Sequence, residues 1–350
     1  MKNRIAFTFA IIFLLGLFLP AEAASEPTIT ERILDRHKVI NIVDDFLAFW
    51  DKAEGKPLKL QRRLWRLMVE SKHQNYFDRA VYGNATAEER RALLDEFLSA
   101  VPQKIESIRR LNSTLLDWST NPIIDALIKF RSSGFFVNYK QPSDIYFGLS
   151  LLQFDGTVRA VGNDFGIPDT LCLGADVLAD YKPEQLRVAI IHEFFHLYHF
   201  SFLLQHPDWF DIGSAHARLM IEGLAVAATE ITYMNQPPFE RSLELYLNFS
   251  EKEIAAQEKE MESIARRYLD LIRADAPREE YEVWFADIET LEAPPRGGYL
   301  LGYKVVKRLL SVYRIDELMR MSPVELRERA EEQLSQMSGD QVLLFSGDRD

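Results

Sequence analysis

The stretch Ile190-Ile191-His192-Glu193-Phe194-Phe195-His196-Leu197-Tyr198-His199 constrains the chain most, because it places an HExxH motif inside an apolar, helix-like run. His192 and His196 are four residues apart, so on an α-helix they lie one turn above each other and can bind one metal ion. Glu193 is poorly placed as a third ligand, but its carboxylate can accept a proton from an attacking water. The spacing therefore predicts a metal site with Glu193 as general base.

The alternative is a buried helix whose histidines form hydrogen bonds inside the core. The chain has only seven histidines, and an HExxH is expected by chance in roughly one such sequence in a hundred. The choice between the two interpretations therefore depends on a third ligand and on the surrounding sequence.

Residues 1–23 have the pattern of a secretory signal peptide. Lys2 and Arg4 precede an apolar run at 5–19, which Pro20 and the small-residue sequence at 21–23 follow. The apolar run has about 15 residues, whereas a helix that spans a bilayer needs about 20. We expect cleavage after residue 23 and no stable membrane insertion afterwards.

The charge limits which partners the protein is expected to bind, and the cysteine content bears on its cellular compartment. Removing Lys2, Arg4 and Glu22 with the signal leaves 39 basic and 52 acidic side chains, a net charge of −13, which argues against nucleic acid or an anionic membrane surface. Cys172 is the only cysteine, so neither an intramolecular disulfide nor a lipid-accepting cysteine after the signal is available. We expect a periplasmic location, with full secretion as the alternative.

Residues 24–131 are expected to form an N-terminal helical region. The capping-box sequence at 86–89 should begin a helix that Pro102 ends or kinks, and Asn121-Pro122 should begin another that runs to about Phe130. Apolar pairs at helical spacing precede them, at Ile33-Leu34, Val39-Ile40, Ile42-Val43 and Phe46-Leu47.

Residues 132–336 are expected to combine a small sheet with further helices. The predicted strands are Phe135-Phe136-Val137, Ile145-Tyr146-Phe147, Leu151-Leu152, residues 157–161 after a hairpin turn at Asp155-Gly156, and Leu171-Cys172-Leu173. Lys182-Pro183-Glu184 should begin the helix that carries the motif. The strand just ahead of that helix is interpreted as an edge strand, with which an extended peptide could pair.

Helical patterns continue to the end of this region. They cover 214–233, a long amphipathic stretch at 239–275, and an apolar stretch at 299–313, and residues 337–350 are expected to be a tail.

Zinc needs three protein ligands if a fourth position is to stay open for water. The downstream candidates are His199, His206, Asp208, Asp211, His216, Glu222 and Glu230. Glu222 is favoured, because Met220-Ile221-Glu222-Gly223-Leu224-Ala225 places a carboxylate in an apolar helix, next to small residues that would let another helix approach. The alternative is a glutamate on the exposed edge of that helix, with Asp208, Asp211 and His216 as reserve ligands.

Two further candidates have supporting roles. Glu230, two turns after Glu222, could hold a ligating histidine by a hydrogen bond, and His199 is better placed as a pocket residue than as a ligand. The metzincin pattern requires a glycine and a third histidine where this chain has His199 and Phe202, so that class is excluded.

An HExxH helix followed by a second helix that supplies a glutamate is the gluzincin plan, and Glu222 comes 26 positions after His196. The sequence resembles the predicted zinc-dependent, gluzincin-like proteases first described as a bacterial domain of unknown function. The resemblance covers roughly residues 140–330. It rests on the segments His192–His196, Glu222-Gly223-Leu224-Ala225 and Pro294-Pro295-Arg296-Gly297-Gly298-Tyr299-Leu300-Leu301-Gly302-Tyr303.

The resemblance implies one Zn²⁺ on His192, His196 and Glu222, with Glu193 as base. From the resemblance together with the sequence pattern, we expect an α+β, mostly α-helical fold, in which the zincin-like metallopeptidase (gluzincin) domain implied by the resemblance occupies 132–336, contains a small sheet and follows an N-terminal helical extension. Tyr299 and Tyr303 share a helix face, and one phenol could donate a hydrogen bond to an oxyanion; the alternative is aromatic packing. Arg296 is a weaker candidate for binding a substrate carboxylate.

Together these features predict an exported hydrolase, a metallopeptidase that cleaves peptide or protein substrates with zinc-activated water. One alternative is a non-catalytic binding protein of the cell envelope that keeps the zincin scaffold, although such a protein has no evident need for Glu193. A second alternative is a helical protein in which the motif is accidental.

Overall fold

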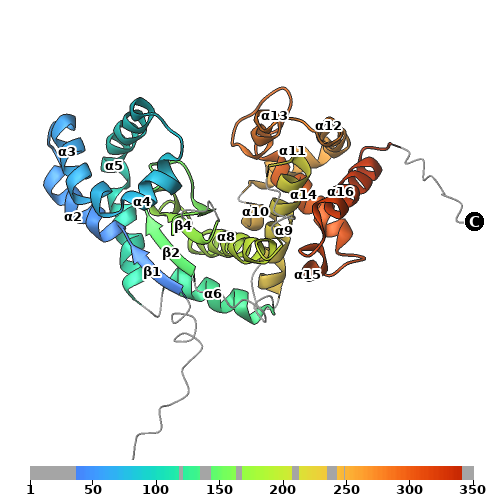
Figure 1. The fold of residues 1–350 in the computed structure, drawn as a ribbon, viewed down its shortest axis with the longest axis horizontal. Coiled ribbons are helices and arrows are strands. Elements are labelled where there is room, and N and C mark those ends of the chain that lie inside the picture. The colour runs from blue at the N-terminus through green and yellow to red at the C-terminus, as the bar shows by residue number, and fades with distance from the viewer. Residues whose placement is uncertain are drawn as a thin grey trace, which may run out of the picture.

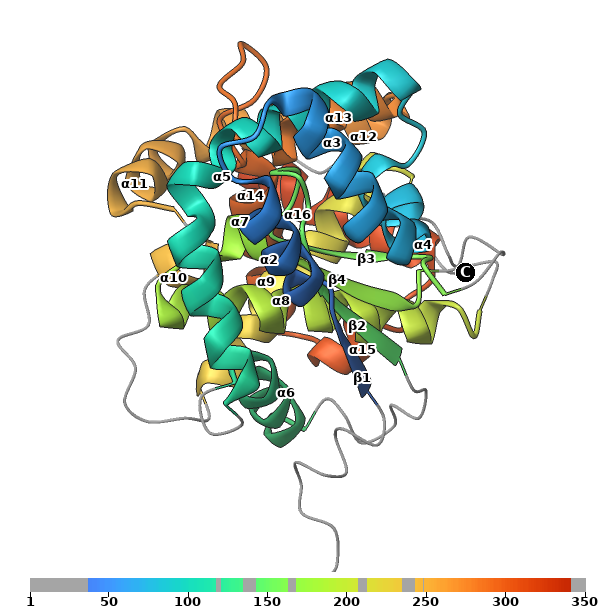
Figure 2. The same ribbon diagram turned by 90° about the vertical axis from the view of Figure 1, so that its left-hand side faces the viewer.

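The computed structural model describes residues 37–117, 121–134, 143–162, 168–206, 213–234, 243–247 and 249–340. The N-terminal helices and the sheet lie at one end of the molecule and the C-terminal helices at the other, with helix α8 (Pro183–Leu203) between them (Figure 1). In Figure 2 the helices α2 (Val43–Ala53), α3 (Leu58–Met68) and α5 (Ala87–Leu116) lie in front of the sheet and α8 behind it. The described residues are mostly helical with one small sheet, which confirms the expected α+β class.

The sheet has four strands in the order β1 (His37–Asn41), β2 (Ser143–Gly148), β4 (Thr170–Gly174) and β3 (Gly156–Arg159). β1, β2 and β4 run parallel, and β3 is antiparallel to β4, with Gly156 opposite Leu173. β4 is buried along its whole length, as a central strand covered on both faces should be. β3 forms one edge of the sheet.

The helical prediction for Val39-Ile40 is wrong. Both residues belong to β1, where Val39 pairs with Ile145 of β2. Branched side chains favour a pleated strand once a partner strand is present, and β2 comes more than a hundred residues later in the chain. The sheet therefore extends across the expected boundary between 24–131 and 132–336.

The strands predicted at 145–147 and 171–173 are confirmed, but the hairpin and edge-strand predictions are wrong. Leu151 and Leu152 have left-handed backbone angles, φ 54° and 67°, in a turn that the buried Asp176 carboxylate holds by accepting the N–H of Leu152 at 2.6 Å. Gly156 begins β3, which pairs with β4 and not with a preceding strand. β4, predicted as an edge, lies inside the sheet.

The N-terminal helices follow most of the expected signals. The Thr86 hydroxyl accepts the Glu89 N–H and begins α5. This helix continues through Pro102, so of the two expected effects of that proline, an end or a kink, the end is wrong. Asn121 caps α6 (Pro122–Ser132), as predicted. Short elements connect α3 to α5, namely η1 (Glu70–Lys72), α4 (Gln74–Tyr76) and the π-helical η2 (Phe77–Tyr82).

The C-terminal helices begin near the predicted residues, with one difference. The single amphipathic stretch expected at 239–275 is divided into α10 (Leu243–Leu247), α11 (Glu251–Lys259) and α12 (Met261–Arg273). Ser250 forms a capping box with Glu253 and begins α11. These helices and their neighbours are α7 (Ala175–Leu178), α9 (Ala215–Met234), α10 (Leu243–Leu247), α11 (Glu251–Lys259), α12 (Met261–Arg273), α13 (Arg278–Glu282), η5 (Val283–Phe285), α14 (Gly297–Leu309), α15 (Ile315–Leu318) and α16 (Pro323–Met337).

Some predicted segments lie outside the described residues. They are the signal peptide at 1–23, the helical pair Ile33-Leu34, the strand at 135–137 and the last ten residues of the tail. Within the described ranges, no helix combines the length and the apolar character that crossing a membrane requires.

Candidate metal centre

Helix α8 brings the motif residues together on one face, as the four-residue spacing predicts. The Nε2 atoms of His192 and His196 lie 3.0 Å apart. Candidate ligand atoms of His192, Glu193 and His196 all lie within 4.8 Å of one another. Phe200, one turn after His196, stacks on its imidazole at 5.8 Å between ring centroids and supports its orientation.

Helix α9 adds the carboxylate that was favoured as the third ligand. Glu222 is buried, and its Oε2 atom lies 3.1 Å from Nε2 of His192 and 3.3 Å from Nε2 of His196. Ligand atoms about 2.0–2.1 Å from a tetrahedral Zn²⁺ are separated from each other by about 3.3 Å. The three atoms therefore have the mutual spacing and the nitrogen and oxygen chemistry that suit one zinc ion.

Arg218, one turn before Glu222 on α9, fixes the other oxygen of this carboxylate. Its Nη1 atom lies 2.5 Å from Oε1 of Glu222, and its guanidinium covers the Phe285 ring at 4.8 Å. Burial opposes ionisation of Glu222, but Arg218 and the two histidines hold its pKa well below the usual range. Glu222 is therefore a carboxylate with one oxygen paired to Arg218 and the other directed at the histidines.

The motif residues have shifted pKa values because the site is enclosed. Burial lowers the pKa of His196 and opposes protonation of His192, whose contact with Glu222 nevertheless raises its pKa. Burial also raises the pKa of Glu193 to about 8. Shifts of this kind are typical of functional sites in clefts.

Two glycines let α14 approach α9 and so determine where both helices place their side chains. A methyl group on Gly223 would lie 2.3 Å from the carbonyl oxygen of Gly302, and one on Gly302 would lie 2.5 Å from the carbonyl oxygen of Leu219. The expectation that small residues beside Glu222 admit another helix is confirmed. The contact ties the Glu222-Gly223 and Tyr299–Tyr303 segments into one structural unit.

The structure separates the two tyrosines that were predicted together. Tyr299 lies beside the motif, with its ring 6.2 Å from the His192 ring, and it lines the cavity that contains Glu193. Burial raises the pKa of Tyr299, so its phenol keeps the proton. The Tyr303 hydroxyl instead donates to Glu230 at 3.1 Å, and Lys307 binds the same carboxylate at 2.8 Å.

Glu230 therefore has Tyr303 and Lys307 as its contacts, and a bond to a ligating histidine is not among those found in the described ranges. His199 is fully buried beside Phe195, and burial lowers its pKa to about 3, in keeping with a pocket or packing role. The reserve ligand His216 contacts Ser214 at 3.3 Å. Asp208 and Asp211 lie outside the described residues.

A cleft of about 850 Å³ contains the site. Its lining includes the edge strand β3 with its flanking residues and residues of α9 and α13, and the cleft also reaches Glu193, His196 and Tyr299. A smaller cavity of about 70 Å³ adjoins His192 and Glu193 on the other side. Glu193, the predicted base, therefore lines both the cleft and the smaller cavity.

Strand β3 lies directly against the predicted base. A methyl group on Gly156 would lie 2.3 Å from Cγ of Glu193, so only a glycine leaves room for the present position of that side chain. We interpreted Asp155-Gly156 as a turn and therefore missed this contact, which depends on the path of β3. The Arg218–Glu222 pair was also missed, although the four-residue spacing on one helix is a recognisable signal.

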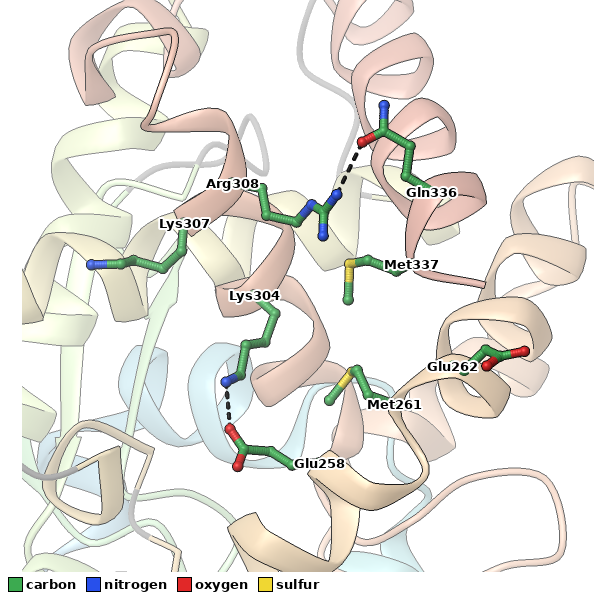
Figure 3. Close-up of a pocket in the computed structure, with 8 residues that line it drawn as sticks. All are labelled: Glu258, Met261, Glu262, Lys304, Lys307, Arg308, Gln336 and Met337. Carbon is green, nitrogen blue, oxygen red and sulfur yellow. Dashed lines mark hydrogen bonds and ion pairs between the residues drawn. The ribbon is translucent and has the colours of Figure 1, made fainter. Parts of the chain in front are cut away.

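Another cavity, of about 620 Å³, lies among α11, α12, α14 and α16 (Figure 3). Its polar side chains bind one another, as in the pairs Lys304–Glu258 and Arg308–Gln336. No histidine is among its eight lining residues. This cavity therefore lacks the ligand set that defines the centre on α8 and α9.

Comparison with known proteins identifies the same region. Residues 156–328, which contain β3, the motif helix, α9 and α14, match a family model described as "Predicted Zn-dependent protease (DUF2268)". No curated protein and no solved structure matches the chain. The match includes His192, Glu193, His196 and Glu222, and the suspected relationship is confirmed. Residues 156–328, just under half of the chain, are therefore similar to this family of predicted zinc-dependent proteases.

Proposed function

We propose that the chain is an exported zinc-dependent metallopeptidase in which His192, His196 and Glu222 hold one Zn²⁺ and Glu193 is the general base. The observation that carries the proposal is the convergence of Nε2 of His192, Nε2 of His196 and Oε2 of Glu222, at separations of 3.0–3.3 Å. A purely structural histidine pair has no need of a buried, ionised carboxylate at both nitrogens.

When bound, Zn²⁺ supplies Lewis acidity, polarising a carbonyl and lowering the pKa of water to about 7. Glu193 adjoins the two ligating histidines on α8 but faces β3 and the cleft, where substrate and water have access. Its carboxylate accepts a proton from the attacking water and delivers it to the leaving amine nitrogen. One residue therefore acts first as base and then as acid.

Tyr299 is suited to stabilise the negative charge that develops on the carbonyl oxygen. Its phenol is protonated and borders the cleft within reach of the His192 side of the site. A hydrogen bond that is stronger in the transition state than in the ground state lowers the barrier, whereas one that is equally strong in both does not. Tyr303 has its hydroxyl on Glu230 and is not assigned this role.

The cleft favours an extended peptide as substrate. β3 is an edge strand of the sheet, and it lies along the cleft next to Glu193. Edge strands have backbone N–H and C=O groups available for an added strand. A peptide bound in this way would bring its scissile carbonyl to the level of Gly156 and Glu193.

The proposed export rests on residues 1–23, where a basic start, an apolar run and a small-residue sequence follow in the order of a signal peptide. The proposed compartment is the periplasm. Cell fractionation of a protein tagged at its C-terminus should recover the shortened chain there, and recovery of the full-length chain in the cytoplasm would contradict this part of the proposal.

The experiment for the activity uses the chain from residue 24 onward. We expect about one equivalent of zinc after purification and cleavage within a diverse peptide library, with both lost after chelation and restored by Zn²⁺. Less than about a tenth of an equivalent of zinc, under conditions that preserve a four-coordinate site, would contradict the zinc centre. Bound zinc without any peptide cleavage would favour the non-catalytic binding protein.

A further inference from the structure

Strand β3 carries a charged residue that the proposed mechanism does not use. Arg159, at the end of β3, is exposed and lines the same cleft as Glu193. Within the described ranges, the one hydrogen bond of its side chain is a long contact of 3.5 Å to the carbonyl oxygen of Val158, and its guanidinium forms no ion pair. A guanidinium has five donors, so most of its hydrogen-bonding capacity faces the cleft.

Two other arginines that line the cleft, Arg218 and Arg278, are each paired with a carboxylate. Arg218 binds Glu222 at 2.5 Å and lies 3.8 Å from Glu282, and Arg278 lies 3.3 Å from Glu282. Desolvation lowers the pKa of Arg159, Arg218 and Arg278 lower it further by charge repulsion, and Glu193 opposes that effect. Unlike Arg218 and Arg278, Arg159 has no carboxylate partner within the described ranges.

The geometry of β3 also gives the distance between Arg159 and the proposed catalytic centre at Glu193. Gly156 packs on Glu193, and Arg159 follows three residues later in an extended strand, about 10 Å away. A peptide paired with the free edge of β3 advances by the same rise per residue. Its residue about three positions from the scissile bond would then lie opposite Arg159.

We propose that Arg159 is a specificity residue that binds a carboxylate of the substrate about three residues from the scissile bond. The inference rests on the proposed peptidase function and names its substrate class, peptides with an acidic group at that distance. The chain has a net charge of −12, but distant charges are screened over about 8 Å at physiological salt. The nearby guanidinium therefore decides the preference, and a bidentate arginine–carboxylate pair gives it strength.

The carboxylate can belong to a glutamate or aspartate side chain or to the C-terminus of the peptide. Digestion of a diverse library, read by mass spectrometry, should show an acidic group enriched two to four positions from the cut on one side. Matched peptides then differ only in Glu, Gln or Lys at that position, and a second pair has a free or an amidated C-terminus. We expect the carboxylate-bearing member to be cleaved with about tenfold higher kcat/KM or more.

Substitutions of Arg159 and Arg278 test which residue causes the preference for an acidic group. In Arg159→Gln, the ratio of kcat/KM for the Glu peptide to kcat/KM for the Gln peptide should fall to about one, while the zinc content is unchanged. In Arg159→Glu, the preference should reverse toward the Lys peptide. Arg278→Gln is the matched control, since this arginine lines the same cleft but is paired with Glu282, and it should keep the preference.

Three outcomes would overturn the inference. Cleavage by the unaltered protein without an acidic preference leaves the peptidase function standing and removes the role of Arg159. Equal loss of preference in Arg159→Gln and Arg278→Gln would indicate a diffuse cleft potential in place of a site. A zinc-loaded protein that cleaves no peptide overturns the proposed function and this inference with it.

Discussion

The two oxygens of Glu222 face different partners, because Oε1 lies 2.5 Å from Nη1 of Arg218 while Oε2 lies 3.1 Å from Nε2 of His192. Arg218 is itself held over the Phe285 ring. This arrangement presents one oxygen of the carboxylate to the two histidines, and it connects Arg218, which is outside the proposed ligand set, to the expected metal affinity.

Replacing Arg218 should therefore weaken zinc binding. We expect Arg218→Met to reduce zinc affinity by about 10- to 100-fold, the usual effect of removing a partner that orients a ligand, and Arg218→Lys to restore part of it. Competition with a chromophoric chelator measures the affinity. Arg266→Met is the control, because Arg266 also pairs with a glutamate four residues away, but on the surface. Equal affinities in Arg218→Met and the control would contradict the orienting role.

Gly156→Ala should impair catalysis while zinc stays bound. The added methyl group would lie 2.3 Å from Cγ of Glu193 and must displace that side chain, whereas no atom of His192, His196 or Glu222 is among its nearest contacts. We expect kcat to fall by about 100-fold, since small misplacements of a reacting group have effects of that order. Gly162→Ala meets only ordinary contacts, at 3.7 Å or more, and should retain activity. Full activity in Gly156→Ala would refute the close packing of β3 on Glu193.

Gly302→Ala should destabilise the fold. A glycine-to-alanine change within a helix ordinarily stabilises it by about 0.5–1 kcal/mol, but here the methyl group would lie 2.5 Å from the carbonyl oxygen of Leu219. Overpacking of this kind costs about 1–3 kcal/mol, so the steric effect outweighs the propensity gain. Denaturant unfolding of the chain with and without the substitution measures the difference, and an unchanged or higher midpoint would show that α9 and α14 do not meet at this glycine pair.

Zinc removal should lower the stability of the whole molecule. A ligand at a thousand times its Kd stabilises the folded state by about 4 kcal/mol, and without the ion the Glu222 carboxylate is buried against two imidazoles. We expect chelation to reduce the thermal midpoint of the unaltered protein and readdition of Zn²⁺ to restore it. His196→Ala should unfold at a temperature that chelator does not change, and a chelator-insensitive midpoint in the unaltered protein would argue against the site.

Local signals in the sequence were enough for much of the site. The spacing of His192 and His196 and the apolar setting of Glu222 each predict a position on a helix face, and helix faces depend on nearby residues. The caps at Thr86 and Asn121 were predictable for the same reason, since a cap involves residues three or fewer apart.

Long-range pairing accounts for what could not be predicted. Val39 is in a strand because β2 is beside it, and β4 is central because β3 returns to its far side. The close contact of Gly156 with Glu193 and the separation of Tyr303 from Tyr299 depend on how strands and helices pack. Such contacts leave no periodic pattern in the sequence.

The most direct test of the central claim is the hydrolysis rate and zinc content of Glu193→Gln. The substitution keeps the size of the side chain and leaves the three ligands in place, but an amide cannot accept the proton from the attacking water. We expect about one equivalent of zinc and a fall in kcat of about 1,000-fold or more. Unchanged turnover by the zinc-loaded variant would contradict the mechanism.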